Sequence, residues 1–141
     1  MTKDQYLKSA MLLDWIGQAP ITINRAFLDL TGNVVTALWL SHAVDKALQV
    51  QGESSVLIEM SSAAIEKDTG ITRAQQQTCR KALVSMGLIT EEGGQGRAPK
   101  FRIHMDRLMQ QLQRQAQPLA DALEQGEQAT AQLANPPTAA N

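Results

Sequence analysis

A run of Arg, Gln and Lys between residues 72 and 86 holds the side chains best suited to chemistry in this sequence. At about 100° per residue, one face of a helix over this run is polar and rich in hydrogen-bond donors, with Lys81 at its edge; it comprises Arg73, Gln76, Gln77 and Arg80. Arg pairs with guanine O6 and N7, and Gln pairs with adenine N6 and N7. The pattern therefore predicts recognition of base edges in duplex DNA.

The opposite face of the same helix is predicted to face a hydrophobic core. It comprises Ala74, Thr78, Cys79, Ala82, Leu83 and Met86. Two residues depart from this division, because Gln75 falls toward the apolar side and Val84 toward the polar side. We expect Gln75 to lie at an edge between helices and Val84 to lie near the end that leaves the DNA groove.

A glycine-rich loop supplies a second basic element. Residues 93–99 hold three glycines and Pro99, so they predict a flexible turn between two strands. Arg97 at the loop tip, with Lys100 and Arg102 on the returning strand, can contact phosphates or the minor groove. From Ile71 to His104 there are six Lys or Arg residues against two acidic ones, although the whole chain has a net charge of -1. This local excess of positive charge is the footprint expected of a DNA-binding surface.

Periodicity and capping residues predict the elements that position these side chains. Helices are predicted over 4–16, 24–30, 34–49, 72–86 and 105–115, and strands over 56–60, 88–92 and 100–104. A further helix is predicted to be capped by Ser61 or Ser62 and closed by Gly70. The order helix, strand, helix, tight turn, helix, strand, loop, strand is that of a winged helix-turn-helix. The predicted fold class is mainly α with a small β-hairpin wing and with extra N-terminal and C-terminal helices. Residues 72–86 are its recognition helix and residues 93–102 its basic wing.

The chain divides at Pro118. Residues 1–117 are predicted to form the winged helix-turn-helix domain with its flanking helices. Residues 118–141, rich in Ala and Gln, are predicted to form a mobile tail, with a marginal helix around 119–133 as the alternative. Residues 34–40 are apolar on nearly every side, so they are buried either in the core or against another subunit. We expect a homodimer, because the helices at 4–16, 34–49 and 105–115 have apolar stripes to spare.

Composition excludes several classes of function. Of the 141 residues, 43% are hydrophobic, enough for a real core, and no apolar run approaches the roughly 20 residues that span a bilayer. The N-terminus lacks the order of a signal peptide, and the lone Cys79 suits a reducing compartment, so we expect a cytoplasmic protein that makes no membrane contact. His42 and His104 lie in different elements, and no phosphate-binding loop is present. We expect no enzyme activity, no catalytic residues, no cofactor and no metal.

Two further single features are assigned structural roles. Cys79 lies on the apolar face of its helix and is expected to be a small buried hydrophobe. Glu91 and Glu92 are adjacent on a strand, so they point to opposite faces and cannot act together.

Two stretches give the sequence a resemblance to a known group. Residues 21–27 with Leu30-Thr-Gly32 and 37–41, and later 68–73, 75–80, Gly87-Leu-Ile89 and 97–101, resemble winged-helix proteins of phages, prophages and plasmids. The resemblance covers about residues 20–110 and implies double-stranded DNA binding in replication or transcription control. Its implied contact residues are Thr72, Arg73, Gln76, Gln77, Arg80, Arg97 and Lys100, to which the residues' own pattern adds Lys81 and Arg102.

A protein-interaction module is the alternative function. Winged helices also bind proteins, and the chain is acidic outside its basic segment. In that case the protein would be a subunit or an antagonist of a larger complex, with a replication or transcription protein as its partner. A stoichiometric protein partner without DNA retention at low salt would favour this alternative.

Overall fold

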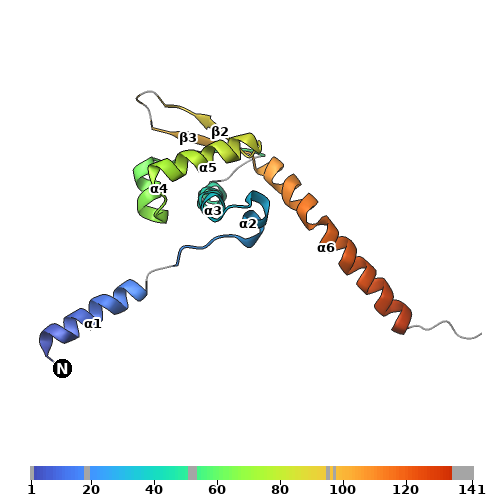
Figure 1. Ribbon diagram of the computed structural model, residues 1–141, viewed down its shortest axis with the longest axis horizontal. Helices are drawn as coiled ribbons and strands as arrows, with labels where there is room; N and C mark the ends of the chain where they lie inside the picture. Colours follow the sequence, from blue (N-terminus) through green and yellow to red (C-terminus); the bar gives the residue numbers. More distant parts are fainter. Residues whose placement is uncertain (1, 18–19, 51–53, 95, 97, 135–141) are drawn as a thin grey trace, which may run out of the picture.

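The computed structural model describes residues 2–17, 20–50, 54–94, 96 and 98–134. Its elements follow one another in a simple order (Figure 1): α1 Lys3–Ile16, α2 Arg25–Thr31, α3 Val34–Gln49, β1 Val56–Glu59, α4 Ser62–Thr69, α5 Arg73–Ser85, β2 Ile89–Glu92, β3 Lys100–Ile103 and α6 Met105–Ala134. The prediction of a mainly helical chain with a small antiparallel sheet is confirmed. Most predicted element boundaries lie within one residue of those observed, and the end of α6 is the large exception.

Helix α3 is the centre of the packed domain. It lies between α2 and α5 (Figure 1), and half of its side chains are buried, among them Trp39 and Leu40. Trp39 meets Phe101 of β3 edge-on, with ring centroids 5.3 Å apart, a favourable geometry for two aromatic rings. The run from residue 35 to residue 40 is therefore apolar on nearly every side because its own domain covers it, whereas Val34 at the start of the helix is exposed.

Local capping explains why the helices begin and end where they do. Asn24, Asn33 and Ser61 each accept a hydrogen bond from a backbone N–H in the first turn of α2, α3 and α4. Gly70 ends α4 in the left-handed conformation at a φ of 79°, which glycine adopts without steric cost. Ile71 is buried in the turn that follows, so α4 and α5 form a tight helix–turn–helix.

The three strands form one antiparallel sheet in the order β1-β3-β2. Phe101 and Ile103 of the central strand β3 face the core, whereas Lys100 is exposed on the other side. The register pairs Ile103 with both Val56 of β1 and Ile89 of β2, so three apolar side chains lie together over α3 and α5. The β2–β3 connection leaves this sheet as a hairpin (Figure 1).

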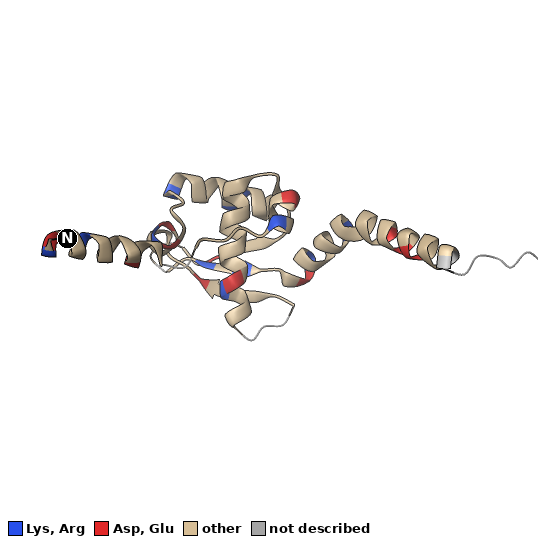
Figure 2. Cartoon of the chain, turned by 90° about the horizontal axis from the view of Figure 1, so that it is seen from below, with Lys and Arg blue, Asp and Glu red and all other residues tan. Residues whose placement is uncertain are grey.

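Helix α6 contradicts the predicted end at Pro118. It runs for 30 residues with Pro118 inside it, so residues 118–134 are helical, in agreement with the alternative of a helix around residues 119–133. A proline within a helix removes one hydrogen bond and bends the axis, and α6 changes direction about halfway along (Figure 2). The Ala, Leu, Gln and Glu residues beyond it are strong helix formers, which is why the helix resumes. Residues 135–141 of the predicted tail lie outside the described residues.

Only the first part of α6 packs on the domain. Leu108 is buried, Gln111 Nε2 donates to the carbonyl of Met86 at 3.0 Å, and Gln115 Nε2 donates to that of Ala26 at 3.2 Å. Beyond Gln115, every α6 residue whose side chain is described is exposed. The outer half of α6 therefore projects from the domain (Figure 1).

Helix α1 projects in the other direction. Each of its residues is exposed, and Figure 1 shows it lying apart from the packed helices. Of the three apolar stripes predicted to be spare, those of α3 and the first part of α6 are used within the domain, and the stripe of α1 is not. Among the described helices, none is long and apolar enough to cross a membrane.

His42 is a titratable group whose pKa is shifted by the fold of this domain. It lies on α3 with its Nε2 3.7 Å from Oδ2 of Asp68 on α4, and Nε2 is buried without a hydrogen-bond partner. Burial, followed by the charge of Lys46, lowers the pKa of His42 below its ordinary value, and these effects outweigh the opposing charges of Asp68 and Asp45. The folded protein thus favours the neutral ring.

We predict an acid-dependent loss of stability that His42 carries. Because the folded pKa lies below the unfolded one, His42's contribution is fully present above about pH 6.5 and is lost as the pH falls toward the folded pKa. The free energy of unfolding, measured by denaturant titration at pH 7.5 and pH 5.5, should fall less in His42→Gln than in the wild type. Equal losses in both proteins would show that His42 does not carry the effect.

Candidate nucleic-acid interface

The exposed face of α5 is rotated about the helix axis relative to the predicted face, so the two faces share only some of their residues. Residues buried on this helix are Gln76, Cys79 and Leu83, at helical spacing. The exposed residues are Arg73, Ala74, Gln75, Gln77, Thr78, Lys81, Val84 and Ser85. Ala74 and Thr78, which were expected to face the core, lie near the middle of the exposed side. The inward positions of Cys79 and Leu83 and the outward position of Val84 are as predicted.

Gln76 is the clearest correction to the predicted contact set. Its side chain is 0% exposed, and its Nε2 donates to the carbonyl oxygens of Ser62 at 3.0 Å and Ile71 at 2.8 Å. These acceptors lie at the start of α4 and in the turn before α5. A buried carbonyl needs a donor, so Gln76 ties the two helices together and cannot contact a base.

Gln75 has a local role that the sequence already signals. Thr72 Oγ1 accepts from the Gln75 backbone N–H at 3.2 Å, and the Gln75 side chain accepts from the Thr72 backbone N–H at 3.0 Å. This reciprocal pair is a capping box. The Thr-x-x-Gln spacing therefore explains the residue that did not fit the apolar side, and Thr72 is occupied as the N-cap of α5.

Arg80 is held against the sheet rather than free on the helix surface. Its Nε lies 3.0 Å from Oε1 of Glu91 on β2, and its guanidinium lies 6.0 Å from the centre of the Phe101 ring. Its side chain is 22% exposed. Since Glu91 compensates its charge, Arg80 joins α5 to the sheet and is not available as predicted.

Arg102 is paired in the same way on the outer side of the sheet. Its Nε and Nη2 donate to the two carboxylate oxygens of Glu92 at 2.8 Å and 3.4 Å, and its Nη1 donates to Ser55 Oγ at 3.3 Å. The hydrogen bond from Arg102 holds the pKa of the Glu92 carboxyl below its ordinary value. Glu91 and Glu92 thus serve different partners on opposite faces, as the strand alternation predicted.

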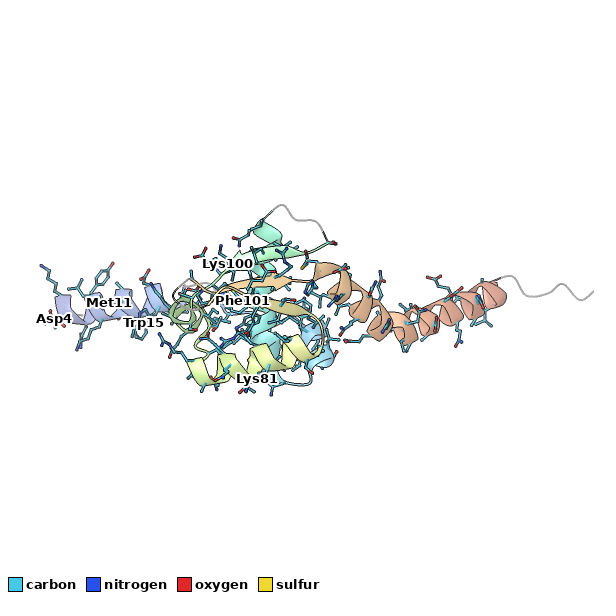
Figure 3. All side chains as sticks on the ribbon, turned by 90° about the horizontal axis from the view of Figure 1, so that it is seen from above. Asp4, Met11, Trp15, Lys81, Lys100 and Phe101 are labelled. Carbon is cyan, nitrogen blue, oxygen red and sulfur yellow. The ribbon has the colours of Figure 1, made fainter. Side chains whose placement is uncertain are left out.

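The remaining predicted contact residues divide between two surfaces. Arg73, Gln77 and Lys81 are brought together on the exposed side of α5, each four residues from the next. Lys100 is exposed at the base of the β2–β3 loop, on the sheet face turned away from α5, and Figure 3 shows Lys81 and Lys100 on opposite sides of Phe101. Arg97 lies outside the described residues. Neither Arg73, Lys81 nor Lys100 makes a salt bridge with another described residue.

Other reactive side chains are placed in structural positions. Cys79 is 2% exposed, and burial raises the pKa of its thiol, which confirms its reading as a small buried hydrophobe. The hydroxyl of Thr90 lies 2.7 Å from Nε2 of His104 across the sheet. Across the ranges the structure covers, no three His, Cys, Asp or Glu residues are grouped as a metal site would require.

Comparisons of the chain with known proteins identify no similar protein. No protein-family model, no curated protein and no solved structure matches the chain. The function of the exposed α5 face is therefore inferred from the side chains that this face carries.

We predict that replacing Gln76 destabilises the domain although it keeps the volume filled. Gln76→Leu leaves the buried carbonyl of Ile71 without its donor and removes the link to Ser62, at a cost of about 1–3 kcal/mol in the free energy of unfolding. The matched control Gln77→Leu, at an exposed site one residue along, should change it by no more than about 0.5 kcal/mol. Urea unfolding of both variants checks this, and equal stabilities would contradict the role assigned to Gln76.

Proposed function

We propose that this chain binds double-stranded DNA through the exposed face of α5, with residues 56–103 acting as a winged helix-turn-helix. The observation that carries the proposal is the set of Arg73, Gln77 and Lys81 on one exposed helix face, with no acidic partner among the described residues. The resemblance to phage and plasmid proteins assigns this binding to replication or transcription control.

The size and shape of α5 support insertion into a major groove. That groove is about 12 Å wide and accepts one helix, and α5 has 13 residues, with its buried side packed on α3. Ala74, Thr78 and Ser85 are small residues on the exposed side. They let the helix backbone approach the bases closely, while the longer side chains beside them reach base edges and phosphates.

The donor types on this face support direct readout by few residues. Arg73 is suited to guanine and Gln77 to adenine, whereas Lys81 is suited to a phosphate as a point charge. Gln76, Arg80 and Arg102 do not contact DNA in this proposal. They position the contact residues, because they fix the rotation of α5 and the position of the sheet. Lys100 contributes at the base of the wing and is expected to have the weaker effect.

We predict that Arg73→Ala combined with Lys81→Ala weakens duplex binding by at least tenfold, about 1.4 kcal/mol or more, because a base contact and a phosphate contact are lost. Gel-shift titration with duplexes selected from a random pool measures the change. Arg25→Ala is the matched control, since Arg25 is also an exposed arginine, 87% accessible, but lies on α2 beyond α3. Unchanged affinity in the double variant, or an equal loss in the control, would exclude this face.

We also predict a steep dependence of duplex affinity on salt. Neutralising about two phosphates, through Lys81 and Lys100, should give a slope near -2 in a plot of log K against log salt concentration for each bound chain. Lys81→Ala should reduce the magnitude of that slope by about one. Absence of binding to any duplex at low salt would contradict the proposal and favour the protein-interaction alternative.

A further inference from the structure

Two helices of this chain present apolar surface that no other described residue covers. On α1, Lys8, Met11, Leu12 and Trp15 line one shallow groove, and Trp15 is 73% exposed. On the outer half of α6, Ala122, Leu123, Gly126 and Thr130 line another, beside Glu127. Figure 3 shows Met11 and Trp15 on α1, the helix that lies apart from the packed helices in Figure 1. Exposed apolar surface of this extent on two separate helices indicates an interaction site.

The outer half of α6 continues a stripe that already packs on the domain. Leu108 and Leu112 contact the core on the first part of the helix. At about 100° per residue, Leu119, Leu123 and Leu133 fall on the same side of the helix, with Ala122 and Gly126 between them. A helix face that stays apolar for four further turns predicts a helical partner there.

The two surfaces match in length, and the charged residues that line their grooves are opposite in sign, although α1 as a whole carries as many acidic as basic residues. At about 1.5 Å per residue, α1 is about 21 Å long and the part of α6 from Leu119 to Ala134 is about 24 Å long. The outer half of α6 carries three acidic residues and no basic one, which Figure 2 shows as red without blue; they are Asp121, Glu124 and Glu127. Lys8 lines the α1 groove and Glu127 the α6 groove. Two copies of outer α6 would instead bring like charges together.

The path of the chain before α2 separates α1 from α6 of the same molecule. Residues 20–22 line a pocket with Leu38 and His42 of α3 and with Asp68 of α4. The backbone N–H of Asn24 then donates to Ser41 Oγ of α3 at 3.0 Å. This segment leads α1 away on the α4 side of the domain, whereas α6 leaves from the α2 side (Figure 1).

We propose that the partner is a second copy of this chain, and that each copy packs α1 on the outer half of the other copy's α6. A two-fold arrangement makes two identical contacts. Six large side chains per copy are central to it, namely Met11, Leu12, Trp15, Leu119, Leu123 and Leu133. At roughly 60–120 Å² of apolar area for each buried side chain, the dimer covers about 700–1,400 Å². That agrees with a standard interface of about 1,200–2,000 Å² in total, of which somewhat more than half is apolar.

Sedimentation equilibrium of the full chain at micromolar concentration tests the proposal without DNA. We expect the wild type at twice the 15.4 kDa of one chain, and Trp15→Glu and Leu123→Glu each at the mass of a single chain. Both residues lie on helix faces that the domain does not cover, so circular dichroism should show both variants folded. Leu48→Glu, at an exposed leucine on α3, is the matched control and should remain dimeric. A monomeric wild type, or dimers of both variants, would overturn the proposal.

Disulfide cross-linking identifies which helices meet. Chains with Met11→Cys and chains with Leu123→Cys, differently tagged and mixed, should form a disulfide between the two tags on mild oxidation. The native Cys79 is buried, and each single variant alone controls for it. A disulfide between two Leu123→Cys chains would mean that α6 packs on α6. A disulfide only within one chain carrying both substitutions would mean that α1 folds back on its own α6. Either result would overturn the exchange of α1.

Discussion

The two hydrogen bonds donated by the Gln76 amide determine how α5 is rotated in this domain. They join a side chain in the second turn of α5 to carbonyls in α4 and in the turn between the helices. The aliphatic part of Gln76 shares the buried side of the helix with Cys79 and Leu83. Because a helix has only one angle about its axis, fixing this side inward fixes Arg73, Gln77 and Lys81 outward. The candidate DNA-binding face is thus a consequence of a polar contact inside the fold.

Charge on the sequence and charge available on the surface are different quantities in this protein. The segment from Ile71 to His104 has a marked excess of Lys and Arg, but its two acidic residues take Arg80 and Arg102 as partners. Both pairs also have a mechanical role, since one joins α5 to β2 and the other joins neighbouring strands. The described cations of this segment that remain for a polyanion are therefore Arg73 and Lys81 on α5 and Lys100 on the other surface of the sheet.

The fold was largely predictable from residues that act locally. Asn24, Asn33, Ser61 and Thr72 cap the helices, and glycines at 32 and 70 end two of them. The candidate site was less predictable, because a helical wheel places Gln76 on the same side as Arg73 and Arg80 and cannot tell that a carbonyl outside the helix needs a donor. The pairing of Arg80 with Glu91 depends likewise on where β2 lies relative to α5. Pro118 misled for a different reason, since the loss of one hydrogen bond is tolerated between two segments with strong helical preference.

Helix α6 projects from the domain, and its packed first part determines how the projecting part is rotated about the helix axis. Gln111 and Gln115 anchor it to α5 and α2, and the leucines beyond Pro118 keep the side occupied by Leu108 and Leu112. Because α6 is continuous, the direction in which the outer half presents its leucines depends on how α5 is oriented. Inserting a single residue near Pro118 would turn the outer half by about 100° relative to α5 while leaving the packed domain unchanged. The number of residues along α6 thus determines how the apolar face of its outer half is oriented relative to α5.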